Sequence, residues 1–271
     1  MPEARSQSTQ RWFAFKHKLG RRPVLGLGIL VWVVFFALWQ AASSFGWVSE
    51  LLMPPPGQVF STLIGLLLDP MFLNDILSSV LRIIVSFAAA CAIAIPLGIL
   101  MGTFHAFEAF FNPFVSAWRY LPAPSFIPIL LMWFGTGEAP KLVLLFIGVV
   151  FFLITLIMDH AKQVRAELIE TALTLGASRW QVLQSVVVPA VLPNVVVAMR
   201  QMLAVSWTYL VIAEIVASTT GIGAMMMRAR RFLHTDEIMS GIIVIGCLGL
   251  LFDLLFRLVH RRWFDYLAEN T

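Results

Sequence analysis

Long apolar stretches alternate with short polar segments along most of the chain. Six of them are long enough to cross a hydrocarbon core of ~30 Å as a helix rising ~1.5 Å per residue; they span residues 24–42, 80–102, 112–134, 141–158, 195–217 and 239–259. The pattern therefore predicts an all-α membrane protein with about six transmembrane helices. No small-residue cleavage site follows the first stretch, so we expect a stable span there and no signal peptide.

Composition excludes a soluble domain. Of the 271 residues, 59% are hydrophobic and only 13% are charged, and the mean hydropathy is +0.86. Too little polar surface remains to cover a soluble fold of this size. Cys91 and Cys247 both lie inside apolar stretches, where we expect packing and no disulfide. Basic residues flanking the spans explain the net charge of +4, so a nucleic-acid partner is not expected.

The chain divides into three predicted regions. These are a basic tail (1–23), a first span with an outer surface helix (24–79), and a core (80–271) whose polar loop covers 159–194. The run Met53–Gly57 predicts a stiff, extended break, and Gln58–Leu68 predicts a helix too short to cross a bilayer. Small residues at intervals of four in the second span predict close approach of another helix; they are Ala90, Ala94, Gly98 and Gly102.

Lysine and arginine positions predict the orientation. No basic residue lies between Ser43 and Val80, whereas the segment before the first span carries Arg5, Arg11, Lys16, Lys18, Arg21 and Arg22. Both termini should therefore face the cytoplasm. One outer loop disagrees with this rule because it contains Arg228, Arg230 and Arg231. We expect these side chains either to extend toward lipid headgroups from an interfacial helix or to form a docking or anion-attracting patch.

Three prolines interrupt the third apolar stretch. Pro122, Pro124 and Pro128 remove amide donors and clash with preceding turns, so nearby carbonyls need partners outside the helix. At membrane depth, irregular backbone is tolerated only against protein or a water-filled path. We therefore expect either a translocation pathway beside this break or a kinked, buried helix.

Two charged residues stand out within apolar surroundings. Arg119 precedes the proline break, and Glu214 lies in the apolar run 210–217. An unpaired charge in hydrocarbon costs ~2.5 kcal/mol or more, so each needs a partner or water. Neighbouring helices or a partner subunit could supply it; alternatively, Arg119 attracts an anion and Glu214 holds an outer gate. Candidate residues of the pathway and gate are Arg119, Tyr120, Ser125, Trp207 and Glu214, although helix-face aromatics more often simply pack.

The polar segment Glu170–Pro189 predicts a helical elbow. The helix-forming stretch Ala166–Leu175 is interrupted by Gly176, and Ser178 is a good residue to cap a new helix. Two short helices should therefore meet at a tight corner that projects from the membrane.

This segment, ETALTLGASRWQVLQSVVVP, resembles the cytoplasmic coupling (EAA) loop of ABC importer permeases. Thr171 replaces the usual first alanine, and Val188 replaces the usual leucine before proline. From about Leu81 onward, the chain resembles the nitrate, sulfonate, taurine and bicarbonate group of these permeases. The matching residues are Trp133–Gly137, Arg200, Glu214, Gly221–Gly223 and Phe232–Asp236.

The resemblance implies a type I ABC importer permease fold and a place in a bacterial inner membrane. It implies a second permease copy, two cytoplasmic ATPase subunits, and a periplasmic or lipid-anchored solute-binding protein. The solute would be a small anion such as nitrate, a sulfonate, taurine or bicarbonate. ATPase coupling would fall to Glu170, Thr171, Ala172, Gly176, Ala177 and Ser178.

Catalytic signatures are absent from the sequence. There is no GxxxxGK[ST] loop, no HExxH, no Cys-x-x-Cys and no Gly-x-Ser-x-Gly. We therefore expect no catalytic residues, metal or cofactor in this chain, with ATP and Mg²⁺ bound by a partner ATPase. Two rival hypotheses are an ion-coupled secondary transporter using the broken third stretch and Glu214, and a membrane-embedded enzyme, which lacks a catalytic cluster.

Overall fold

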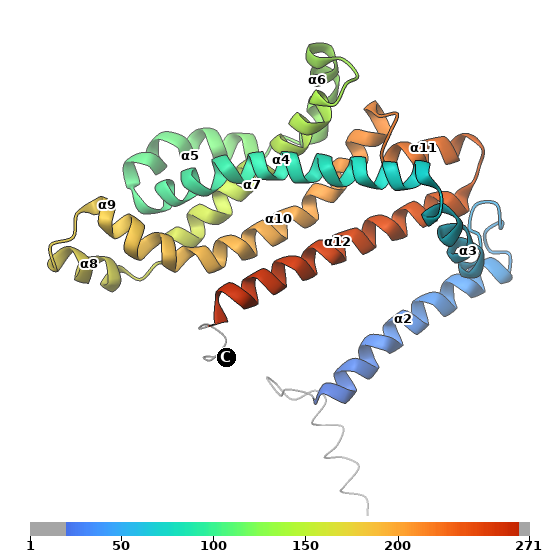
Figure 1. Cartoon of the computed structure of the whole chain (residues 1–271), viewed down its shortest axis with the longest axis horizontal. Helices are drawn as coiled ribbons and strands as arrows, with labels where there is room; N and C mark the ends of the chain where they lie inside the picture. The colour runs from blue at the N-terminus through green and yellow to red at the C-terminus, as the bar shows by residue number, and fades with distance from the viewer. Residues whose placement is uncertain (1–19, 266–271) are drawn as a thin grey trace, which may run out of the picture. The chain divides into compact units, whose positions relative to one another are not determined.

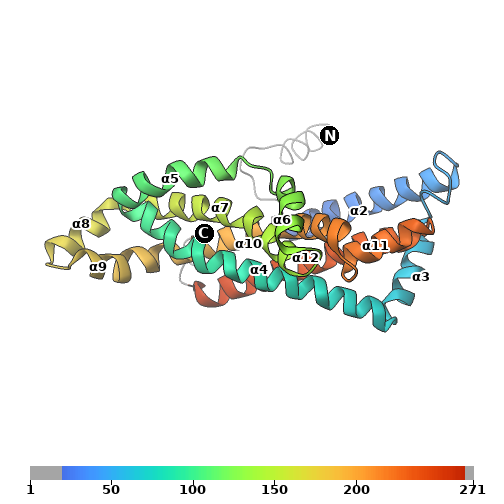
Figure 2. The same cartoon turned by 90° about the horizontal axis from the view of Figure 1, so that it is seen from above.

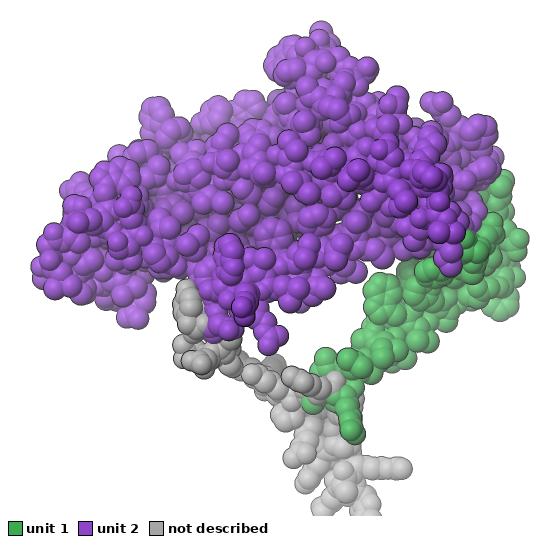
Figure 3. All heavy atoms as spheres, in the orientation of Figure 1, with its two compact units in different colours: residues 1–61 green, residues 62–271 purple. Residues whose placement is uncertain are grey.

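The computed structural model describes residues 20–265, and these form helices without strands. Contacts divide the chain into two units, one ending at Ser61 and one beginning at Thr62 (Figure 3). The tail residues Arg5, Arg11, Lys16 and Lys18 lie outside the described residues, as does the side chain of Arg21.

The first unit contains α2, Arg21–Ser44, and the start of α3, Pro56–Leu67. The proline-rich connection folds back on α2, because the Trp39 indole N–H donates to the carbonyl oxygen of Pro54 at 3.0 Å. The rings of Phe36 and Phe60 lie 5.9 Å apart between their centroids. The predicted short helix after the prolines is confirmed.

Three long helices form the core of the second unit: α4, Pro70–Thr103; α7, Ala139–Lys162; and α10, Val188–Ala217 (Figure 1). The predicted ridge of small residues on α4 is the surface that meets α7. A Cβ atom added at Gly98 would lie 2.8 Å from Cβ of Ile157, and one at Gly102 would lie 2.4 Å from Cβ of Ala161. The backbones of α4 and α7 therefore approach as closely as the glycines allow.

The third predicted span is not one helix. It divides into α5, His105–Arg119; a short 3₁₀ turn, η1, Ala123–Phe126; and α6, Ile127–Phe134, which stands out from the bundle in Figure 1. Proline at 122, 124 and 128 prevents a continuous hydrogen-bond ladder, as predicted. Phe104 alone, in extended conformation, separates α4 from α5. Glu108 in the first turn of α5 pairs with Lys162 of α7 at 2.5 Å, which holds α5 against the end of α7.

Five helical stretches among the described residues are long and apolar enough to cross a membrane: α2, α4, α7, the continuous stretch Arg179–Ala217, and α12, Thr235–Trp263. The remaining predicted span, residues 112–134, is the segment that divides into α5, η1 and α6. Cys91 and Cys247 are both free thiols, and Cys91 is buried as expected, whereas the expected packing of Cys247 is not seen because its side chain is exposed.

Candidate functional site

The predicted elbow is present between α8, Ala166–Thr174, and α9, Arg179–Val182. Gly176 turns the corner with a φ of 88°, a conformation that glycine adopts without strain. Ser178 then caps α9 reciprocally. Its hydroxyl accepts from the amide of Gln181, and the Gln181 side chain accepts from the amide of Ser178 at 2.7 Å. Local sequence therefore specifies the corner.

A hollow of about 370 Å³ lies inside the elbow. Leu175, next to the corner, is 83% exposed, and no residue of α8 is buried. Leu173 and Trp180 nearby are exposed too, and a group of exposed apolar side chains beside a hollow is typical of a surface that meets another protein. The hollow is lined by Ala172, Leu175, Gly176, Ala177, Gln181, Val182, Ser185 and Val186.

Glu170 and Thr171 lie on the exposed surface of α8. The Thr171 hydroxyl donates to the carbonyl oxygen of Glu167 at 2.6 Å, so it stays within its own helix. Within residues 20–265, no basic side chain pairs with the Glu170 carboxylate. That carboxylate is therefore available to a partner.

The elbow connects to the far end of the unit through one rod. After α9 the chain continues through a π-helical turn, η2, Leu183–Val187, into α10, so helix is unbroken from Arg179 to Ala217. Figures 1 and 2 both place α8 and α9 at one end of the second unit and α11, Ile222–Arg231, at the other. Glu214 lies near the end of this continuous helix that is farther from the elbow.

Glu214 is fully buried, with 0% exposure, and its charge is compensated from three directions. The carboxylate accepts from the Ser79 hydroxyl at 2.7 Å, Nη1 of Arg82 at 2.6 Å and the Gly223 amide at 2.8 Å. The expectation that a neighbouring helix satisfies Glu214 is confirmed, because Arg82 and Ser79 both belong to α4.

Arg82 ties three segments together. Beyond Glu214, it donates from Nε and Nη2 to both carboxylate oxygens of Glu138, at 2.6 and 2.8 Å, and from Nη1 to the carbonyl oxygen of Thr220 at 2.8 Å. Glu138 lies at the α6–α7 turn, and Thr220 lies in the loop before α11. The guanidinium fork therefore holds α4 against one end of α7 and one end of α10.

The loop before α11 is held by a second set of contacts to α4. The Gly221 amide donates to Oδ1 of Asp75 at 2.7 Å, and Asp75 also pairs with Arg228. Gly221 has a φ of 111°, and a Cβ atom there would lie 2.3 Å from Oε1 of Glu214. Only glycine fits between the buried carboxylate and the loop.

Glu138 is the exposed end of this ion cluster, with a side chain 56% accessible. The hydrogen bond from Arg82, supported by one from Lys141 at 2.7 Å, lowers the pKa of Glu138 to about 2. Its carboxylate is therefore charged throughout the physiological range.

The other predicted pathway residues do not join this cluster. Arg119 pairs with no carboxylate among the described residues, and its guanidinium carbon lies 5.3 Å from the centre of the neighbouring Tyr120 ring. Ser125 is exposed, whereas Trp207 is buried with its ring 5.9 Å from that of Phe252. The three arginines expected in the outer loop differ in their surroundings. Arg228 pairs internally with Asp75, whereas Arg230 and Arg231 are exposed.

Sequence reasoning missed Arg82, Asp75 and Lys141. Arg82 is the only charged residue of the predicted span 80–102, and that isolation was the available signal. Its pairing could not be inferred, because Glu214 lies 132 positions away along the chain.

Comparison with known proteins adds an independent finding. The family described as "Binding-protein-dependent transport system inner membrane component" matches residues 94–265. The chain is 32% identical to the taurine transport system permease of Escherichia coli (strain K12), over 93% of each chain. It is 31% identical to a putative aliphatic sulfonates transport permease of Bacillus subtilis (strain 168), over 92% of this chain and 91% of the relative. An inward-facing methionine ABC transporter has a similar fold, with a TM-score of 0.64 and 18% identity over 71% of this chain and 95% of that one.

Proposed function

Since the chain belongs to the family of binding-protein-dependent transport system inner membrane components and is a permease subunit of an ABC importer, we propose that its solute is a small anion. A sulfonate is our first choice and nitrate or bicarbonate the alternatives. This order is supported by the relatives, which are named as a taurine permease and a putative aliphatic sulfonates permease, because taurine, a zwitterion, and the aliphatic sulfonates all carry an anionic sulfonate group.

The proposed assembly contains two copies of this chain, two cytoplasmic ATPase subunits and an external solute-binding protein. ATP and Mg²⁺ bind to the ATPases, and this chain contributes no catalytic residue. Both termini and the elbow face the cytoplasm, so the ion cluster lies toward the outer side. The opposite placement of the elbow and α11 in the second unit supports this arrangement (Figure 2).

The observation that carries the mechanism is the unbroken rod from Arg179 to Ala217. One end begins at the elbow hollow, which receives a side chain of the ATPase, and the other carries the buried Glu214. The helix is continuous through the π-helical turn Leu183–Val187 and past Pro193, so it connects the two ends directly. Displacement of the elbow by a closing ATPase therefore shifts Glu214 relative to α4.

Within this mechanism, each coupling residue has a physical role. Gly176 forms the corner, Ser178 begins the rod, and Ala172 with Ala177 keeps the hollow open. Glu170 offers an unpaired carboxylate to a basic residue of the ATPase, and Thr171 completes the exposed face of α8.

Co-purification and reconstituted transport test the proposal. A tagged chain should bring down two ATPase subunits, and vesicles should take up taurine only with ATP and a loaded binding protein. Uptake driven by an ion gradient without ATP would instead support the secondary transporter. A binding protein that takes up none of the named anions would contradict the substrate class.

A further inference from the structure

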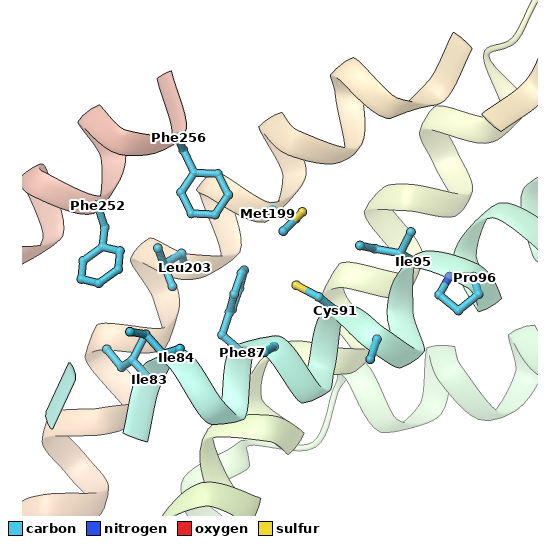
Figure 4. Close-up of a pocket in the computed structure, with 12 residues that line it drawn as sticks. Ile83, Ile84, Phe87, Cys91, Ile95, Pro96, Met199, Leu203, Phe252 and Phe256 are labelled. Carbon is cyan, nitrogen blue, oxygen red and sulfur yellow. The ribbon is translucent and has the colours of Figure 1, made fainter. Parts of the chain in front are cut away.

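Two hollows meet between α10 and α12. The larger is a groove of about 540 Å³ with almost wholly apolar walls, to which α4 also contributes. Figure 4 shows its side chains converging from the three helices. The residues that matter here are Phe87, Cys91, Met199, Leu203, Phe252 and Phe256.

The smaller hollow, of about 130 Å³, is cationic. Arg200 of α10 lines it together with Arg257 and His260 of α12, above an apolar floor that includes Val196 and Phe256. Phe256 lines both hollows, so the cationic hollow lies next to the apolar groove.

Each carboxylate oxygen of Asp253 pairs with one of the two arginines, Arg200 and Arg257. Its Oδ1 lies 3.1 Å from Nε of Arg200, and its Oδ2 lies 2.6 Å from Nε of Arg257. Within residues 20–265, no other carboxylate pairs with either arginine. One negative charge thus orients two positive ones, and their terminal N–H groups remain available. Arg200 is 33% and Arg257 63% exposed, so both can be reached.

We propose that the two adjacent hollows bind one anionic phospholipid. The phosphate diester contacts Arg200, Arg257 and the His260 ring, and one acyl chain lies in the groove. Guanidinium groups favour phosphate because they donate in a planar fork. Basic pockets between transmembrane helices recognise anionic headgroups in the same way.

The order of residues along the helices supports a lipid over a free anion. On α10, Arg200 is followed by Leu203 toward the middle of the span. On α12, Arg257 is preceded by Phe252 in the same direction. Charge therefore lies near the span's end and apolar surface lies deeper, as in a phospholipid at the membrane surface. Arg261 and Arg262, the next basic residues of α12, mark that end.

This inference rests on the membrane placement of α10 and α12 that the proposed function requires, and it is independent of the solute. The competing occupants are a free oxyanion, which needs no groove, and a helix of a second copy, which needs no phosphate.

The test uses the full-length chain purified in detergent and native mass spectrometry. Dioleoyl phosphatidylglycerol should be retained as one molecule per chain, in preference to dioleoyl phosphatidylcholine. The double variant Arg200→Gln/Arg257→Gln should weaken retention at least about tenfold. The matched control Arg261→Gln/Arg262→Gln removes two nearby charges that do not line the hollow, and it should retain the lipid.

A second variant tests the groove. Ala92→Phe adds a ring to an exposed position that lines it. It should weaken dioleoyl phosphatidylglycerol and leave the dihexanoyl form, whose chains are short, less affected. If the double arginine variant fails to elute as a single species, lipid retention is measured on the single variant Arg257→Gln. This side chain is largely exposed, so its replacement should leave the fold intact.

Equal retention of the two dioleoyl lipids, or unchanged retention in the arginine variants, would overturn the proposal. So would displacement by inorganic phosphate or taurine at concentrations similar to those of the lipid, since that indicates a free-anion site. Loss of a dimer in Ala92→Phe without any lipid retained would assign the groove to a second copy. An elbow variant such as Ala177→Trp should lose transport and keep the lipid, which separates this inference from the proposed function.

Discussion

Two glycines with positive φ, Gly176 and Gly221, mark two regions that are built by opposite means. A Cβ atom at Gly176 would meet nothing within 4 Å, whereas one at Gly221 would lie 2.4 Å from the carboxyl carbon of Glu214. The elbow around Gly176 is exposed and specified by neighbours in sequence. The ion cluster around Gly221 is buried and specified by residues from distant helices. The elbow therefore depends on a partner to bury its surface, and the cluster depends on the rest of its own chain.

This contrast predicts that changes in the cluster reduce stability first, whereas changes in the elbow reduce coupling first.

Arg82→Ala should have the largest effect. It removes the only cation bonded to buried Glu214 among the described residues, and it also removes the bonds from Arg82 to Glu138 and to Thr220 in the loop before α11. Breaking a buried ion pair costs ~3–5 kcal/mol. Thermal unfolding in detergent should show a large drop in Tm. Arg230→Ala, an exposed arginine on α11, is the control and should change stability by less than about 0.5 kcal/mol. Equal Tm values for the two variants would exclude a structural role for the cluster.

Gly221→Ala should be the next most harmful, and Gly176→Ala is its matched partner. Both force alanine into a positive φ, at a cost of order 1–3 kcal/mol. Only Gly221→Ala also pushes a methyl group against Glu214 and Arg82. The Tm of Gly221→Ala should therefore fall further. If Gly176→Ala were equally destabilised, the open space around the elbow would not distinguish the two sites.

The same contrast explains what sequence could reveal. Gly176, Ser178 and Gln181 lie within six positions and encode the corner and cap locally, so the elbow was predictable. Arg82, Glu138 and Glu214 meet only because three helices pack, and no local pattern carries that information. The prolines of the third stretch predicted its break. The position of α6 could not be predicted, because it depends on contacts across the bundle.

Glu138→Gln should have a smaller, pH-dependent effect. Its folded pKa, about 2, lies below the ordinary value of 4.5, so ionisation stabilises the fold above pH 4.5. That contribution is lost as pH falls from 4.5 toward 2. Because the side chain is half exposed, we expect at most about 1 kcal/mol. The Tm difference between wild type and Glu138→Gln should therefore narrow from pH 7 to pH 3. A difference that widens on acidification would reverse the assigned sign.

Ala177→Trp should leave stability nearly unchanged and abolish uptake. The new ring enters the hollow between α8 and α9, where it contacts solvent before assembly and blocks a partner's side chain afterwards. Reconstituted ATPase activity should no longer respond to loaded binding protein. Leu168→Trp is the control, because it enlarges an exposed residue of α8 that does not line the hollow. Normal coupling in Ala177→Trp would place the ATPase contact elsewhere.

Glu170→Gln should produce the smallest change in stability, because the side chain is exposed and pairs with no basic residue of the described chain. Its size is kept and only the charge is lost, so ATPase subunits should still co-purify. A lost ion pair to the ATPase would show as weaker stimulation by loaded binding protein, or as hydrolysis without transport. Glu167→Gln, one turn earlier on α8, is the matched control, since that carboxylate lies near Arg165 of its own chain at 3.4 Å. Unchanged stimulation in Glu170→Gln would remove this carboxylate from the coupling surface, and an equal defect in Glu167→Gln would mean that only the total charge of α8 matters.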